Sequence, residues 1–160
     1  MKLPALKIGE LVSKLPIIQG GMGVGISMSK LASAVAKEGG IGVIAAAMPG
    51  IHEPDIAENS QAANIRVLRD EIRKARANTN GVLGVNIMVA LTNFGDMVRT
   101  AIEEKIDIIF AGAGLPLDLP GYLTNSTKTK LVPIVSSGRA AAIICKKWLK
   151  RCDYLPDAFV

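Results

Sequence analysis

Short apolar runs alternate with longer amphipathic stretches along this 160-residue chain. The apolar runs do not alternate between apolar and polar positions, as a half-exposed strand would. Strands of this composition are buried on both faces, as in a parallel sheet. The pattern predicts five strands, near residues 16–20, 41–47, 82–90, 106–112 and 131–136, and a sixth that begins within residues 156–160.

Helical periodicity separates these strands. Leu31 and Val35, four residues apart, predict one apolar helix face. The full pattern predicts helices over residues 29–38, 58–78, 93–104 and 139–151. Prolines interrupt residues 48–55 and 114–123, so both are expected to be loops, the second with at most a turn or two of helix. The alternation predicts an α/β fold, either a (β/α)₈ barrel or a doubly wound open sheet.

The composition narrows the class of protein. Hydrophobic residues make up 49% of the chain, which excludes general disorder, and the aromatic content of 4% predicts a core of Ile, Val, Leu and Ala. No apolar run reaches the ~18 residues of a membrane span. Cys145 and Cys152 are the only cysteines, and they show no metal-binding spacing. We therefore expect no metal site, a reduced cytoplasmic setting and two buried core thiols.

The net charge is +5, and much of it lies in residues 66–76 and 145–151. Both segments have the spacing of amphipathic helices with basic outer faces. Basic helices can bind nucleic acid or a membrane surface. However, the aromatic residues on which single-stranded nucleic acid stacks are scarce in this chain. We therefore expect neither nucleic acid nor a membrane as a partner.

The segment "PIIQGGMGVGIS", residues 16–27, places four glycines within six positions between a strand and a helix. It is not a dinucleotide fingerprint, because Ile26 stands where the third glycine is required and no acidic residue ends the second strand. It is not a P-loop either, because no lysine follows the glycines. Two interpretations remain: bare backbone on which a flat ring can lie, or a tight turn packed under the next helix.

Several segments together resemble one known family. "PIIQGGMGVGIS", "EGGIGVIAA", "LGVNIMVAL", "IIFAGAGLPLDLP" and "LVPIVSSGRAAAIICKKW" occur in this order in nitronate monooxygenases, formerly called 2-nitropropane dioxygenases. The resemblance extends from about Leu15 to Val160. The chain is also similar to flavin-dependent enoyl-acyl-carrier-protein reductases, which share the same barrel.

The resemblance implies an FMN enzyme on a TIM (β/α)₈ barrel, here truncated after about five βα units. Residues 1–160 would then be the amino-terminal part of a single FMN-binding domain, incomplete at its carboxyl end. The family's catalytic histidine lies in a glycine-rich loop beyond Val160. His52 is the only histidine, and it does not match that motif, so no catalytic residue is assigned.

The resemblance also implies cofactor-binding residues. Gly21, Met22 and Gly23 would lie against the isoalloxazine ring, and Asn86 would hydrogen-bond the flavin. An alternative for Asn86 is a buried side chain satisfied by neighbouring backbone. At the ends of later strands, Gly112 and Gly114 would keep the edge open. Ser136 would contact the cofactor or, equally well, cap the helix at 139–151.

The activity implied is FMN-dependent oxidation of alkyl nitronates by O₂ to carbonyl compounds and nitrite. An alternative enzyme reduces an enoyl thioester with NAD(P)H. An alternative of another class is an inactive truncated gene product. Residues 1–160 alone are expected to bind FMN weakly, because the phosphate sites of such barrels typically follow strands seven and eight.

Overall fold

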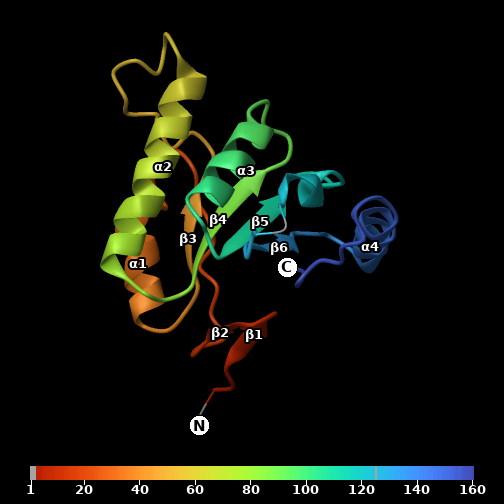
Figure 1. Cartoon of the computed structure of the whole chain (residues 1–160). Helices are drawn as coiled ribbons and strands as arrows, with labels where there is room; N and C mark the ends of the chain where they lie inside the picture. The colour runs from red at the N-terminus through yellow and green to blue at the C-terminus, as the bar shows by residue number, and fades with distance from the viewer. Residues whose placement is uncertain (1–2, 125) are drawn as a thin grey trace.

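The structure is a computed structural model that describes residues 3–124 and 126–160. A parallel sheet of four strands lies at its centre in the order β3–β4–β5–β6 (Figure 1). The strands are Gly42–Ala45, Leu83–Met88, Ile108–Gly112 and Lys130–Pro133. Because spatial order follows chain order, the sheet winds in one direction, as in a (β/α)₈ barrel, without the reversal of a doubly wound sheet.

The helices cover one face of this sheet. They are α1 (Ser29–Lys37), α2 (Ser60–Asn78), α3 (Phe94–Glu103) and α4 (Gly138–Cys152), with a short 3₁₀ turn η1 (Leu119–Tyr122) before β6. All four helices begin and end within two residues of the predicted bounds. Side-chain caps account for two of the starts: Asn59 accepts from the Ala62 N–H, and Ser137 accepts from the Ala140 N–H.

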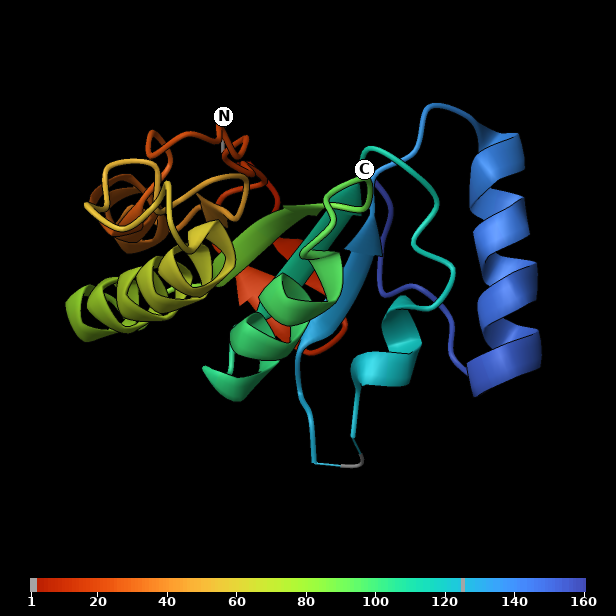
Figure 2. The ribbon, with the colours of Figure 1, turned by 90° about the horizontal axis from the view of Figure 1, so that it is seen from above.

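The opposite face of the sheet carries a second apolar cluster. Its members on the sheet include Val43, Ile108, Phe110 and Val132, and Ile8 packs on them from an antiparallel hairpin of β1 (Leu6–Ile8) and β2 (Leu11–Ser13). Figure 1 shows this hairpin below the sheet, at the amino ends of its strands, and Figure 2, seen from above, shows α2 and α3 along one side of the strands. The hairpin was not predicted, because strands of three residues are too short to show a period.

The first predicted strand, residues 16–20, is wrong as an element. It forms a single parallel bridge between Ile18 and Ile41. Beyond the bridge, the side chain of Gln19 makes the two hydrogen bonds that a neighbouring strand would make with Val43. Its Nε2 donates to the Val43 carbonyl at 3.0 Å, and its Oε1 accepts from the Val43 N–H at 3.2 Å. The chain therefore leaves the sheet one residue before the glycines begin.

Residues 156–160 are not a strand, yet they extend the sheet past β6. The N–H of Asp157 donates to the Leu131 carbonyl at 3.1 Å, and the N–H of Val160 donates to the Pro133 carbonyl at 3.0 Å. Residue numbers rise together along both segments, so the pairing is parallel. The carboxylate of Asp157 also accepts from the Leu131 N–H at 2.8 Å. The predicted direction of a sixth strand is thus confirmed, although its regular pairing is not.

Two predictions about burial are wrong. Leu31 is 44% exposed, and α1 is buried through Ala32 and Ala36 instead, because only small side chains fit between this helix and the sheet. Cys152 is exposed and Cys145 half-buried, so they are not a pair of core thiols. In α4 the buried side chains are Ile144 and Trp148.

Candidate functional site

The candidate site lies at the carboxyl ends of the parallel strands, where ligands bind in sheets of this kind. The glycine segment, residues 20–27, is hydrogen-bonded to the end of β3. The N–H of Val24 donates to the Ala47 carbonyl at 2.8 Å, and the N–H of Ala45 donates to the Ser27 carbonyl at 3.0 Å. The segment is therefore anchored to the sheet on both sides of its turn.

Close packing explains why two of the loop positions are glycine. A Cβ atom at Gly21 would lie 2.7 Å from the Cβ of Asn86, and one at Gly23 would lie 2.8 Å from the Ala47 carbonyl oxygen. Gly25 has a φ of +76° and packs on the ring of His52, which is exposed. The tight-turn interpretation is therefore confirmed, although the turn packs on strand ends and not only on α1.

The same turn leaves unpaired backbone donors. The amides of Gly21 and Gly23 have no hydrogen-bond partner among the described residues, whereas those of Met22 and Val24 are both bonded. Gly20 has nothing within 4 Å of where a side chain would stand. The turn is thus packed on one side and presents free N–H groups on the other, while the binding of a flat ring stays a prediction.

Asn86 stands directly beside this turn. It pairs with Ala45 and Phe110 across the sheet, and its side chain lies on the same sheet face as Phe110. It is half-buried, and its side-chain amide makes no hydrogen bond to any described residue. The alternative of a buried asparagine satisfied by backbone is therefore wrong. Its amide can donate to and accept from a polar ligand.

Backbone strain is concentrated at this edge. Val24, Met48 and Ala113 all have φ values between 50° and 55°, and each lies in a loop that adjoins or follows a strand end. This left-handed region is unfavourable for residues with a side chain, above all for β-branched valine. Strain of this kind clusters at binding and catalytic sites. Lys105 and Asp153, the other such residues described, follow helix ends, where this conformation is common.

Large apolar side chains are also exposed here. Met22, Met48 and Met88 are 60%, 45% and 37% exposed, and all three belong to the carboxyl edge of the sheet or its loops. Methionine sulfur is polarizable and makes favourable contacts with aromatic rings. The edge therefore combines soft apolar contacts with free amide donors, which suits a flat heteroaromatic ligand.

The remaining predicted residues lie around the ends of β5 and β6. Gly112 is buried, and a Cβ atom there would lie 3.1 Å from the Cβ of Ile134. Gly114 has a φ of +142° and lines, with the exposed Ser136, a cavity of about 400 Å³. The cap interpretation of Ser136 is wrong, because Ser137 caps α4. Met88 and Gly112 are paired across the sheet and connect this cavity to the Asn86 region.

Gln19 and Ser27 are two structural contributors that the sequence interpretation missed. Gln19 closes the strand pairing ahead of the turn, and Ser27 is buried inside it. Their polarity is the sequence feature that could have identified them, since both are polar residues that flank an apolar and glycine-rich segment.

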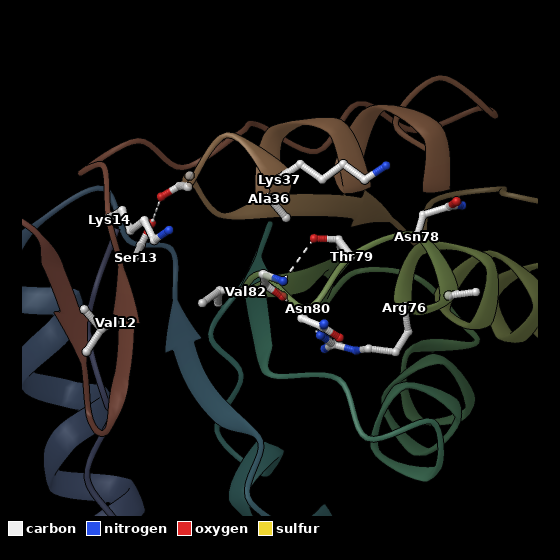
Figure 3. Close-up of a pocket in the computed structure, with 14 residues that line it drawn as sticks. Val12, Ser13, Lys14, Ala36, Lys37, Arg76, Asn78, Thr79, Asn80 and Val82 are labelled. Atoms are coloured by element: carbon white, nitrogen blue, oxygen red, sulfur yellow. Dashed lines mark hydrogen bonds between the residues drawn. The ribbon is translucent and has the colours of Figure 1, made fainter.

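A larger cavity, about 550 Å³, lies at the opposite, amino-terminal end of the sheet (Figure 3). It is lined by Lys14, Lys37 and Arg76 together with the loop that joins α2 to β4. Arg76 already donates to Asp107 at 2.6 Å and to the Gly81 carbonyl at 3.0 Å. None of the described non-glycine residues with positive φ lines this cavity.

Over residues 3–124 and 126–160, no group of three or more His, Cys, Asp or Glu side chains is placed to hold a metal ion. In the same part of the chain, no helix combines the length and apolarity that crossing a membrane requires.

The sheet order and the loop at its carboxyl edge define an α/β-barrel scaffold of the kind that enzymes use. A sequence model of the nitronate monooxygenase family matches residues 5–160. The chain therefore belongs to the nitronate monooxygenase family, whose members are flavin-dependent oxidoreductases. No curated protein sequence matches the chain.

Among solved structures, FabK from Thermotoga maritima is similar at 30% identity with a TM-score of 0.62, over 82% of this chain and 37% of that chain. A mutant of the same FabK gives 30% identity and a TM-score of 0.66, over 82% and 40%. Nitroalkane oxidase from Streptomyces ansochromogenes shares the fold, with a TM-score of 0.65 at 17% identity, over 83% and 44%. This chain thus spans about two fifths of the length of these similar structures.

Proposed function

We propose that the carboxyl edge of the sheet binds FMN and that the protein oxidises alkyl nitronates in the cytoplasm. The observation that carries this proposal is the turn at Gly21–Gly23, whose free amides stand beside the unpaired side chain of Asn86. Both groups can hydrogen-bond the heteroatoms of an isoalloxazine ring, while Met22 contacts its π-face. Gly112 and Ser136 extend the proposed site toward the cavity beside α4.

Bound FMN would supply the redox chemistry for oxidising a nitronate, with O₂ as the final oxidant and a carbonyl compound and nitrite as the products. The residues of this chain would hold and orient the ring. None of them is assigned a proton-transfer role. We further propose that residues 1–160 are the amino-terminal part of one barrel domain, since they align with about two fifths of the similar structures.

A second candidate function is reduction of an enoyl thioester with NAD(P)H. Its support is specific: the chain is 30% identical to FabK, an enoyl-acyl-carrier-protein reductase, but only 17% identical to the nitroalkane oxidase. Two assays on the flavin-loaded protein separate the candidates. Nitrite released from a nitronate in the presence of O₂ supports the first, and NAD(P)H consumed with an enoyl thioester supports the second.

The cofactor proposal is tested by titrating FMN into the protein and following the quenching of flavin fluorescence. Asn86→Ala should weaken binding about 3- to 10-fold, because it removes one hydrogen bond of ordinary strength. Asn93→Ala is the matched control. Asn93 lies in the loop after β4, and its side chain does not cap α3. Equal FMN affinity in the Asn86 and Asn93 variants would exclude Asn86 from the site.

A further inference from the structure

Ser27 is one of the most buried polar residues described, with 1% of its surface exposed, and it holds the glycine turn together. Its hydroxyl oxygen accepts the N–H of Met22 at 2.9 Å and lies 3.5 Å from the Gly20 carbonyl oxygen. Its own N–H donates to the Met22 carbonyl at 2.9 Å, and its carbonyl accepts from Ala45 at 3.0 Å. One residue therefore links both sides of the turn to β3.

These bonds divide the amides of the turn into two sets. Met22 donates to Ser27, and Val24 donates to Ala47, so both of these N–H groups point into the protein. The amides of Gly21 and Gly23, which alternate with them, have no partner among the described residues. With Met22 and Val24 bonded inside the protein, the N–H groups of Gly21 and Gly23 are left free to donate to a ligand.

Ser27 does not serve as a cap for the helix that follows. The N-cap position of α1 is Met28, which makes no side-chain cap bond, and the N–H of Ser29 is bonded to the carboxylate of Glu71 at 2.8 Å. The hydroxyl of Ser27 is thus committed to the turn. Removing it would leave the Met22 amide unpaired next to a buried site and free the turn to rotate its amides.

We infer that Ser27 is a positioning residue for flavin binding at the glycine turn. Its hydroxyl accepts the Met22 N–H, so the N–H groups of Gly21 and Gly23 are the ones that can donate to a bound flavin. This inference rests on the proposed function for its ligand but not for its geometry. Gly21, Met22 and Gly23, which were all expected to lie against the isoalloxazine ring, would then contribute different groups. Met22 contributes its side chain, and its N–H is not available to the cofactor.

The test compares Ser27→Ala with Ser27→Thr, which keeps the hydroxyl. Ser33→Ala is the matched control, because Ser33 is also buried and donates its hydroxyl to one backbone carbonyl, but within α1. Amide hydrogen exchange by NMR gives the first readout, without flavin. The Met22 amide should be protected from exchange in the wild type and in Ser33→Ala. It should exchange roughly 10-fold faster in Ser27→Ala and be protected again in Ser27→Thr.

Flavin titration gives the second readout. FMN should slow exchange at Gly21 and Gly23 and leave the Met22 rate unchanged. The Kd for FMN should rise about 3- to 10-fold in Ser27→Ala, recover in Ser27→Thr and stay unchanged in Ser33→Ala. A shifted flavin midpoint potential in Ser27→Ala would support the same conclusion, since a purely structural loss would not move it.

Three results would overturn the inference. An unchanged Met22 exchange rate in Ser27→Ala would show that the hydroxyl does not hold this amide. Faster exchange with an unchanged Kd would show a structural residue that does not position the ligand. Protection of Met22 instead of the glycines on FMN addition would reverse the assignment. If the wild type binds no FMN, the proposed function and the positioning role both fail, while the exchange data still decide whether Ser27 holds the turn.

Discussion

Replacing Gly42 with alanine should strongly destabilise the protein, because this glycine lets α1 lie directly on β3. A Cβ atom at Gly42 would lie 1.8 Å from the Ala32 carbonyl oxygen and 2.9 Å from the Ala32 Cα. Ordinary contacts of a Cβ atom begin near 3.4 Å. The obstacle is helix backbone, which cannot rotate away as a side chain can. The helix would have to retreat by about 1.5 Å from a close-packed interface.

The cost of that retreat outweighs the benefit of alanine. Overpacking a core costs about 1–3 kcal/mol and sometimes more. The clash at Gly42 is with helix backbone, so its cost lies at or above the upper end of this range. The retreat of the helix would also loosen the packing of Ala32 and Ile44, both fully buried. Alanine loses less backbone entropy on folding and returns only about 0.5–1 kcal/mol. We therefore expect the free energy of unfolding to fall by about 2–3 kcal/mol in Gly42→Ala.

Urea unfolding followed by far-ultraviolet circular dichroism measures this change. With a slope of about 2 kcal/mol per molar urea, the midpoint should fall by about 1–1.5 M. Gly20→Ala is the control, because nothing lies within 4 Å of its Cβ position and its φ is not in the left-handed region. Its midpoint should stay the same or rise slightly. Equal midpoints for Gly42→Ala and Gly20→Ala would refute the steric argument.

Two further stability predictions concern buried polar bonds. Burial alone would raise the pKa of Glu71, but hydrogen bonds from Lys74 and Ser29 outweigh it and lower the pKa below its ordinary value of 4.5. Glu71→Gln should therefore lower the free energy of unfolding by about 1–2 kcal/mol at neutral pH. The difference from wild type should shrink as the pH falls below about 4.5, because the wild-type carboxylate then becomes protonated. A difference in urea unfolding that stays constant down to about pH 3 would contradict this. Trp148→Phe should lower the free energy of unfolding by about 2 kcal/mol, because the indole is fully buried in the core and its N–H donates to the Pro116 carbonyl at 2.9 Å. An unchanged midpoint of urea unfolding, followed by circular dichroism, would contradict this.

Apolar periodicity was sufficient to predict the central architecture. Runs such as residues 82–90 can be buried only in a sheet covered on both faces, and the helices between them followed from a 3.6-residue period. These signals are local, so they survive without knowledge of the neighbours. The same local logic failed for Leu31 and Cys152, because which side of a helix is covered depends on what the rest of the chain places against it.

Only part of the candidate site could be predicted from the sequence. The glycine segment and Asn86 stood out because they interrupt apolar runs, and the structure places Gly21 against Asn86. Their roles depended on contacts between distant segments. Only the fold shows that Ser27 occupies the Met22 amide and that Ser137, not Ser136, caps α4.

The sequence by itself therefore determined the four strands of the central sheet and the four helices, because burial on two faces and a helical period are local features of the sequence. Tertiary structure alone decided which hydrogen-bonding groups at the carboxyl edge remain free. A donor is available only if no neighbour has taken it. At Gly21 and Gly23 that depends on Ser27 and on Ala47, a residue more than twenty positions further along the chain.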